Sequence, residues 1–147
     1  METVRTFLWF PAGLVPSVLD HYESVFPSFK RGESWISDEY STADFSIAGQ
    51  PFLMMSMDSG PAFNDSISIM VEVETQAEVD SIWEKLTAEG EEIACGWCRD
   101  KFGVTWQVVP AGLREIMEHP DAEVRAHVHQ VFRTMKKIVL ADLLPTS

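Results

Sequence analysis

The two cysteines are the residues of this chain whose spacing most directly suggests chemistry. Cys95 and Cys98 form a C-x-x-C, which can serve as a redox pair or as half of a zinc site. A redox pair works best at a helix N-terminus, which lowers the thiol pKa, whereas both flanks here have the composition of strands. A zinc site needs two more ligands, and no second C-x-x-C or H-x-x-x-H supplies them. We therefore interpret both cysteines as small core residues on a strand.

The histidines do not form an alternative site. His127 and His129 are two apart in a predicted helix, so they lie on opposing faces and cannot share a metal as i, i+4 histidines can. His21 lies in the first predicted helix and is expected to be exposed. No Ser-His-Asp or Cys-His arrangement follows from the spacing, and G-x-S-x-G is missing.

Composition limits the possible partners. A chain of 147 residues with 46% hydrophobic and 23% charged residues is typical of one globular domain, here 1–147. A formal net charge of −12 disfavours nucleic acids and anionic membranes, because both attract Lys and Arg. The N-terminus lacks the pattern of a signal peptide, and no apolar run approaches the roughly 18 residues of a membrane span. These features predict a cytoplasmic location.

The elements that position these residues follow the same order twice. Module one, about residues 3–58, has these predicted elements: a strand at 3–10, an amphipathic helix from Pro16 to before Pro27, and strands at 34–38, 43–48 and 52–58. A polar connector, 59–65, follows. Module two, about 66–110, has these: a strand at 66–73, a helix opened by the capping box Thr75-x-x-Glu78 and closed by Gly90, and strands at 93–97, 98–102 and 104–109.

This repetition predicts an α+β fold of two βαβββ modules that form a curved, eight-stranded sheet with a cleft. Beyond Pro110 the apolar spacing becomes helical, so residues 111–147 are predicted to be a helical extension without a counterpart in the first half. A tight turn at 100–103 sets the register of the last hairpin and therefore the direction of Gln107.

The order of elements resembles the vicinal oxygen chelate superfamily, which includes glyoxalase I, bleomycin-resistance proteins and extradiol dioxygenases. Several segments look like its PhnB-like branch: Gly49-Gln50 before a Met-rich strand, 67–75, 83–86, 95–97 and 100–110. Members of that branch often carry the label 3-demethylubiquinone-9 3-methyltransferase. The chain, however, has nothing like the Gly-rich strand-to-helix turn with which a Rossmann-type methyltransferase binds its cofactor.

The resemblance implies a cleft in each half and four positions where metal-dependent members carry ligands. Those positions fall near four residues of this chain: Arg5, Met54, Ser68 and Gln107. An Arg cannot ligate, a thioether suits only soft metals, and Ser and Gln are weak neutral donors. We therefore expect neither a metal nor another cofactor. The alternative is a shift of register that recruits Asp58 or Glu72, and carboxylates without a His would favour Mg²⁺ or Ca²⁺.

Alternation along the strands places six residues on the side of the implied cleft: Phe7, Trp9, Met54, Ser56, Met70 and Thr105. Arg5 and Gln107 add polar groups to it, and the resemblance adds Ser68, so these nine residues are the predicted ligand-binding site. An apolar cleft with a few convergent polar groups is the ordinary form of a small-molecule site. The alternative is that the aromatic residues fill the core or a dimer interface. Trp97 and Trp106 are expected to pack in the core against a helix.

We expect a metal-free, PhnB-like protein that binds a small organic ligand, and whether it is an enzyme stays open. The resemblance also implies a homodimer, because this superfamily commonly completes its clefts by pairing modules across chains. One alternative is a metal-dependent isomerase, lyase or dioxygenase with unorthodox ligands. The other is a bleomycin-resistance-like protein that sequesters a drug, since an acidic surface would suit a cationic one.

Overall fold

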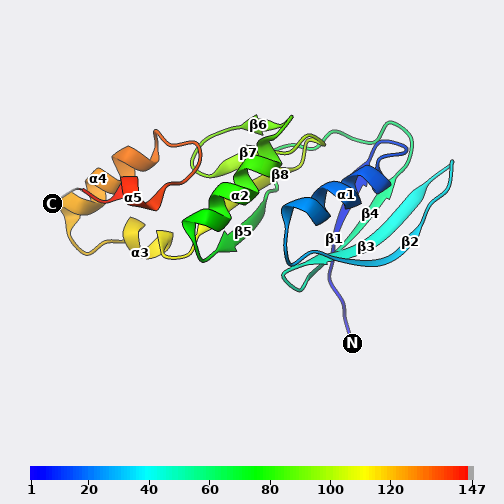
Figure 1. The fold of residues 1–147 in the computed structure, drawn as a ribbon, viewed down its shortest axis with the longest axis horizontal. Helices are drawn as coiled ribbons and strands as arrows, with labels where there is room; N and C mark the ends of the chain where they lie inside the picture. The colour runs from blue at the N-terminus through cyan, green and yellow to red at the C-terminus, as the bar shows by residue number, and fades with distance from the viewer. Residues whose placement is uncertain (146–147) are drawn as a thin grey trace. The chain divides into compact units, whose positions relative to one another are not determined.

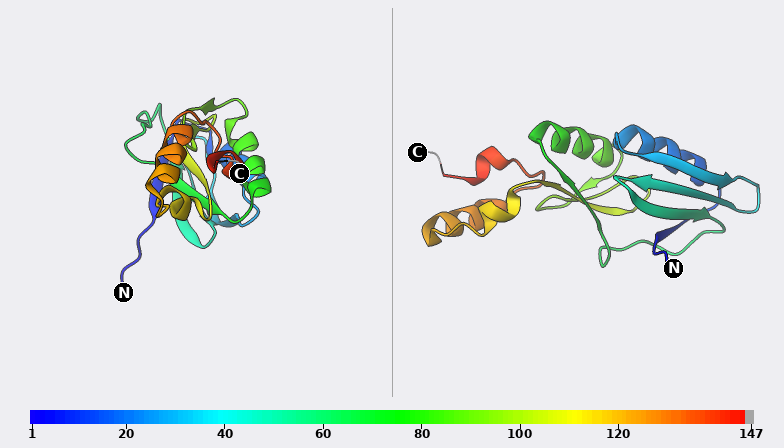
Figure 2. Two further views of the ribbon diagram at one scale, coloured as in Figure 1. Left: turned by 90° about the vertical axis from the view of Figure 1, so that its left-hand side faces the viewer. Right: turned by 90° about the horizontal axis from the view of Figure 1, so that it is seen from below.

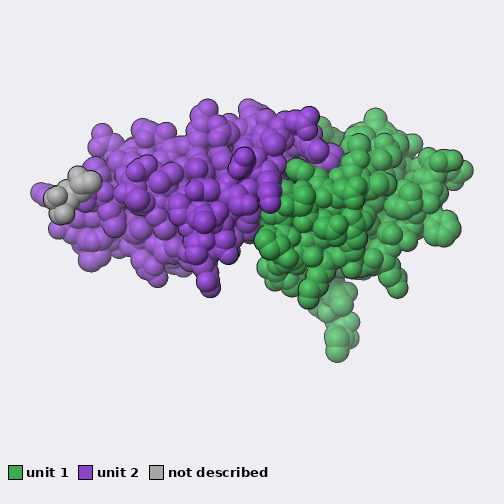
Figure 3. All heavy atoms as spheres, viewed as in Figure 1, with its two compact units in different colours: residues 1–62 green, residues 63–147 purple. Residues whose placement is uncertain are grey.

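The computed structural model describes residues 1–145 and divides the chain into two compact units, Met1–Ala62 (unit 1) and Phe63–Ser147 (unit 2), coloured separately in Figure 3. The boundary lies inside the connector predicted at 59–65. Whether the two units form one domain over residues 1–147, as the sequence predicts, depends on how they assemble, so this part stays a prediction.

Unit 1 has one helix and four strands: β1 (Thr6–Phe10), α1 (Val15–Val25), β2 (Lys30–Trp35), β3 (Ser41–Ile47) and β4 (Gln50–Ser56). The strand order is β1-β4-β3-β2, in which β1 and β4 are parallel and the other pairs are antiparallel. Helix α1 covers one face of this sheet (Figure 2). Its predicted apolar stripe is buried there, with Tyr22 fully buried and its ring 6.0 Å from that of Phe45.

Unit 2 repeats this order and then adds three helices: β5 (Ile69–Val73), α2 (Gln76–Thr87), β6 (Glu91–Glu92), β7 (Trp97–Arg99), β8 (Thr105–Pro110), α3 (Leu113–Met117), α4 (Ala122–Phe132) and α5 (Leu140–Leu143). Its strand order is β5-β8-β7-β6. The α+β class and the two βαβββ modules are therefore confirmed. The eight strands of the described residues are hydrogen-bonded as two sheets of four.

Helix α2 begins as its sequence predicts. The Thr75 hydroxyl accepts a hydrogen bond from the Glu78 backbone N–H at 3.2 Å, and the Glu78 carboxylate accepts one from the Thr75 N–H at 2.9 Å. The prediction that Gly90 closes the helix is wrong, because Glu89 takes the left-handed conformation, with φ 59°. Gly90 is needed for space instead, since a Cβ there would lie 2.3 Å from the carbonyl oxygen of Arg99.

The strand predicted at 93–97 is a turn. Cys95 and Gly96 have φ values of 56° and 83°, which a strand cannot accommodate. Their N–H groups donate to the carbonyl oxygens of Met135 and Lys136, each at 2.8 Å. The turn is therefore bonded to the C-terminal extension through these N–H groups, and to β8 through the carbonyl oxygen of Gly96, which accepts from the Val108 N–H at 2.8 Å.

The strand predicted at 34–38 begins earlier, as β2. Its register against β3 shifts between Arg31 and Ser34, which marks a bulge. Gly32 lies inside this bulge, and a Cβ there would lie 2.8 Å from the Asp44 Cβ. The close approach of the two strands explains why a glycine stands at this position.

The helical extension predicted after Pro110 is confirmed over the described residues, where α3, α4 and α5 follow β8 (Figure 1). It contributes most of a small core, whose buried residues are Val109, Val128, Ile138 and Leu143. Eight further apolar side chains pack around it: Leu113, Ile116, Met117, Val124, Val131, Phe132, Met135 and Leu140. In the described part of the chain, no helix is both long enough and apolar enough to cross a membrane.

Candidate functional site

The sheet of unit 2 has one face packed on α2 and one free of it. Residues paired across neighbouring strands lie on the same face. Trp106 is paired with Cys98, and both are completely buried on the α2 side. The opposite face, called here the open face, carries alternate residues of each strand: Ser68, Met70, Glu72, Trp97, Arg99, Thr105, Gln107 and Val109.

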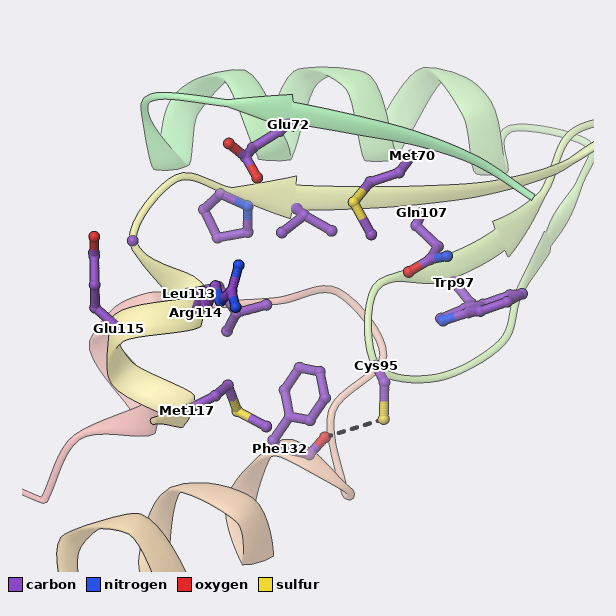
Figure 4. A pocket seen from close by; sticks show the side chains of 13 residues that line it. Met70, Glu72, Cys95, Trp97, Gln107, Leu113, Arg114, Glu115, Met117 and Phe132 are labelled. Carbon is purple, nitrogen blue, oxygen red and sulfur yellow. Dashed lines mark hydrogen bonds between the residues drawn. The ribbon is translucent and has the colours of Figure 1, made fainter. Parts of the chain in front are cut away.

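A cavity of about 730 Å³ lies over the open face, between the sheet and helices α3 and α4 (Figure 4). Strands β5, β7 and β8 and the turn before β7 provide one wall, lined by Met70, Glu72, Cys95, Trp97, Gln107, Val109 and Pro110. The start of the extension, α3 and the end of α4 provide the other, lined by Gly112, Leu113, Arg114, Glu115, Met117 and Phe132. The C-terminal extension therefore completes a site that the sheet alone would leave as a flat surface.

Gln107 is held in this cavity by Ser68. The amide Nε2 of Gln107 donates to the Ser68 hydroxyl oxygen at 2.8 Å, which leaves the amide oxygen as an acceptor toward the cavity (Figure 4). In the register of the sheet, Gln107 stands between Met70 and Trp97. The structure thus places three predicted site residues, Ser68, Met70 and Gln107, next to one another on the open face.

Thr105 shares the open face but is sealed off from the cavity. It is 2% exposed, and its hydroxyl donates to Asp65 Oδ1 at 2.7 Å. Arg99 forms a two-pronged ion pair with the same carboxylate, at 3.0 and 2.6 Å. The Arg99 guanidinium and, after it, the Thr105 hydroxyl hold the pKa of Asp65 below its usual value. Thr105 therefore anchors the segment that leads into β5.

In unit 1, the predicted site residues lie on two different faces of the sheet. Met54 is paired with Leu8 and Ala43 on the side that packs on α1, and it is completely buried. Ser56 shares that side and is 1% exposed. Their assignment to the same face as Phe7 and Trp9 is wrong by one residue of register, which moves a side chain to the other face.

The residues of β4 that do share a face with Phe7 and Trp9 are Leu53 and Met55. Phe7 is 52% exposed, and the Trp9 indole N–H donates to the carbonyl oxygen of Met57 at 2.9 Å. Arg5 forms an ion pair with Asp44 at 2.9 Å, and both line a smaller cavity of about 260 Å³. Of the five residues predicted for a site in unit 1, Arg5 alone lines a described cavity.

Trp97 lines the cavity, where it is paired with Gln107, and does not pack in the core with Trp106 as predicted. The signal was available, because Trp97 and the buried Cys98 are adjacent in a strand and must point to opposite faces. Met117 and Phe132 were also missed, since they come from the extension that has no equivalent in the repeated modules.

The two cysteines have different environments. Cys98 is buried on β7, as expected, and its burial, with the nearby charges of Asp100 and Glu92, raises the pKa of its thiol to about 12. Cys95 lies in the turn before β7, so the strand prediction is wrong there. Its Sγ donates to the carbonyl oxygen of Phe132 at 3.5 Å (Figure 4).

The four positions matched to metal ligands do not form a ligand set. Arg5 is paired with Asp44, Met54 points into the α1 side, and Ser68 and Gln107 are bonded to each other. Leu53 and Met55, which replace Met54 on the correct face, offer no hard donor atom. Glu72 lies on the open face, but its cross-strand partner is Val109 and not Gln107. The matched positions therefore provide no set of hard donors for a divalent metal, and among the described residues no group of three or more His, Cys, Asp or Glu side chains is placed to hold one.

Comparisons with known proteins agree on the family. The family model described as 3-demethylubiquinone-9 3-methyltransferase matches residues 2–109. The PhnB protein from Bacillus cereus is 26% identical, with a TM-score of 0.68 over 75% of this chain and 100% of that one. No curated protein matches.

More distant structures share the fold alone. The glyoxylase/bleomycin resistance protein/dioxygenase domain from Frankia sp. is 15% identical, with a TM-score of 0.53 over 74% of this chain and 95% of that one. FosX from Listeria monocytogenes, a fosfomycin resistance protein of which a mutant was crystallised with Mn(II) and 1S,2S-dihydroxypropylphosphonic acid, is 16% identical. Its TM-score is 0.57 over 78% of this chain and 95% of that one.

Proposed function

Because the chain belongs to the 3-demethylubiquinone-9 3-methyltransferase family, as a PhnB-like member of the vicinal oxygen chelate superfamily, we propose that it binds a small organic molecule without a metal. The observation that carries the proposal is the cavity of about 730 Å³ over the open face of unit 2. Its volume falls within the range usual for small-molecule sites, and its lining combines apolar side chains with a few polar groups, as is common in such sites.

The proposal does not include the methyl transfer in the family's description. Rossmann-type methyltransferases bind their cofactor at a Gly-rich turn between a parallel strand and a helix. Here the first strand is followed by Pro11-Ala12-Gly13, and each sheet has one parallel pair and two antiparallel pairs. The architecture is therefore of a different kind.

A thermal-shift screen of a small-molecule library tests the site. A compound at about 100 times its Kd stabilises a protein by about 2.7 kcal/mol. Met70→Trp should weaken the binding of any hit about tenfold or more, because the larger side chain enters the cavity. Ile67→Trp is the matched control, since Ile67 is 76% exposed and does not line the cavity. A library without hits, or hits that Met70→Trp leaves unchanged, would contradict the proposal.

Elemental analysis tests the absence of a metal from the purified protein. We expect no stoichiometric divalent ion in the wild type, because the side chains at the matched positions are poor donors. One bound ion per chain that disappears in both Ser68→Ala and Gln107→Ala would overturn this part of the proposal.

A homodimer and a cytoplasmic location complete the proposed function. Light scattering after gel filtration should give about twice the mass of one chain, and a monomer at micromolar concentration would contradict the dimer. Fractionation of the source cells should place the protein with the cytoplasmic markers.

A further inference from the structure

We propose that the cavity of unit 2 selects an organic cation, namely a primary ammonium group a few carbon atoms away from an aromatic or aliphatic body. This inference rests on the proposed function, because it names the class of ligand for the same site. It follows from how the sheet register and the two helices distribute apolar groups and carboxylates along the cavity.

The apolar part of the cavity is built around one row of the sheet. Met70, Gln107 and Trp97 are neighbours across three strands, and the side chains of Met117 and Phe132 face this row from the helices (Figure 4). Two thioethers and two aromatic rings make a polarisable surface that suits a flat apolar body. The amide oxygen of Gln107 adds one acceptor in the middle of the row.

The charged part begins one row further along the sheet. Glu72 is two residues from Met70 on the same face, so the two side chains are separated by about 7 Å along the strand. Glu115 on α3 also lines the cavity, at the same end as Glu72 (Figure 4). Among the described residues, neither Glu72 nor Glu115 takes part in an ion pair. Both carboxylates are exposed at this end of the cavity, and Glu72 lies one row away from Met70.

Arg114 is the one basic residue in the lining, and its geometry does not favour an anion. Its Nε lies 3.1 Å from the Glu118 carboxylate, and its side chain is 87% exposed. An anionic ligand would have to compete with Glu118 for this guanidinium and would also meet Glu72 and Glu115. An ammonium group at this end of the cavity would instead meet the carboxylate acceptors of Glu72 and Glu115, while the body of the ligand lies along the apolar row.

Three probes of nearly equal shape distinguish the charge classes. The Kd values of 2-phenylethylammonium, 2-phenylethanol and 3-phenylpropanoate would be measured by NMR titration of the full chain at pH 7 in 150 mM NaCl. We expect the ammonium to bind about fivefold more tightly than the alcohol, and the carboxylate to bind most weakly. Equal binding of ammonium and alcohol, or tightest binding of the carboxylate, would overturn the inference and leave the proposed function standing.

Substitution of Glu72 distinguishes an effect of this carboxylate on ligand binding from an effect of the overall negative charge of the chain. Glu72→Gln should remove the preference for the ammonium and leave the Kd of the alcohol unchanged, whereas the control Glu74→Gln should preserve both values. Glu74 is exposed and does not line the cavity. A preference that survives in Glu72→Gln would overturn the inference. Absence of binding by all three probes would do so too, and absence of any hit in the wider library would in addition refute the proposed function.

Discussion

The carboxylate of Asp100 joins the turn before β8 to the core beneath it. Oδ1 accepts hydrogen bonds from the backbone N–H groups of Phe102 and Val104, at 2.9 and 3.1 Å. Oδ2 accepts one from the indole N–H of Trp106 at 2.9 Å. Asp100 is 3% exposed and Trp106 is completely buried, so these bonds fix the register of the hairpin that carries Gln107.

Asp100→Ala should destabilise the protein by about 2–4 kcal/mol, because it leaves buried donors without their charged acceptor. Urea unfolding monitored by circular dichroism measures this loss. Asp38→Ala is the control, since Asp38 is exposed, and its effect should stay within about 0.5 kcal/mol. Equal unfolding free energies for the two variants would show that the turn holds its register without Asp100.

Because the thiol of Cys98 is buried, we expect the free energy of unfolding to decrease at high pH. Its pKa is raised from an ordinary 9.0 to about 12, so the folded state binds more protons than the unfolded state between these values. The contribution of this thiol to the free energy of unfolding is therefore complete below about pH 9 and is lost as the pH rises toward 12. Urea midpoints at pH 8 and pH 10 should fall less in Cys98→Ala than in the wild type. An equal fall would contradict the raised pKa.

At the scale of elements, the segment between α4 and α5 is tied to α2 and to the turn before β7. The side-chain amide of Gln76 donates to the carbonyl oxygen of Ile138 at 2.9 Å and accepts from the N–H of Leu140 at 3.1 Å. Lys137 adds an ion pair with Asp80 at 2.9 Å. Through these contacts α2 holds the extension that forms the outer wall of the cavity.

Gln76→Ala should loosen this attachment and cost about 1–3 kcal/mol, since two backbone groups lose their partner. Hydrogen exchange measures the effect locally. The amides of Cys95 and Gly96, which are bonded to the same segment, should exchange faster, whereas amides of β3 in unit 1 should not change. The control is Gln130→Ala on the exposed side of α4. Unchanged exchange at Cys95 and Gly96 would refute the role of Gln76.

At the scale of the whole molecule, charge is the dominant feature. The chain has 23 acidic and 11 basic residues and a formal charge of −12. The ion pairs described above involve exposed or half-exposed side chains, and such pairs contribute little each. We therefore expect the repulsion among the excess carboxylates to destabilise the fold by more than these ion pairs stabilise it.

Raising NaCl from 20 to 500 mM should increase the free energy of unfolding by on the order of 1 kcal/mol, because salt screens the net repulsion. Urea unfolding at the two salt concentrations measures it. Sodium sulfate is unsuitable as the salt, since it also strengthens apolar burial. A decrease in stability with NaCl would mean that the ion pairs outweigh the net charge.

Local patterns determined much of this protein. The capping box of α2, the apolar stripe of α1, the turn at 100–103 and the repeated βαβββ order depend on neighbours in sequence, and all are confirmed. The family was also evident from local motifs and is shown by the match to residues 2–109. Such features can be predicted from the sequence because the interactions that form them span only a few residues.

The tertiary structure alone decided which side chains share a face and what covers them. Met54 and Ser56 lie on the α1 side and not in the expected cleft, because the register of β4 differs by one residue from the predicted one. Alternate residues of a strand point in opposite directions, so a difference of one residue changes the face. Trp97 faces the cavity because it alternates with the buried Cys98 along β7. Met117 and Phe132 form its outer wall because the extension packs back on the open face, through contacts between residues distant in sequence. Local periodicity carries no information about such contacts, so the sequence determined the modules and the packing determined the site.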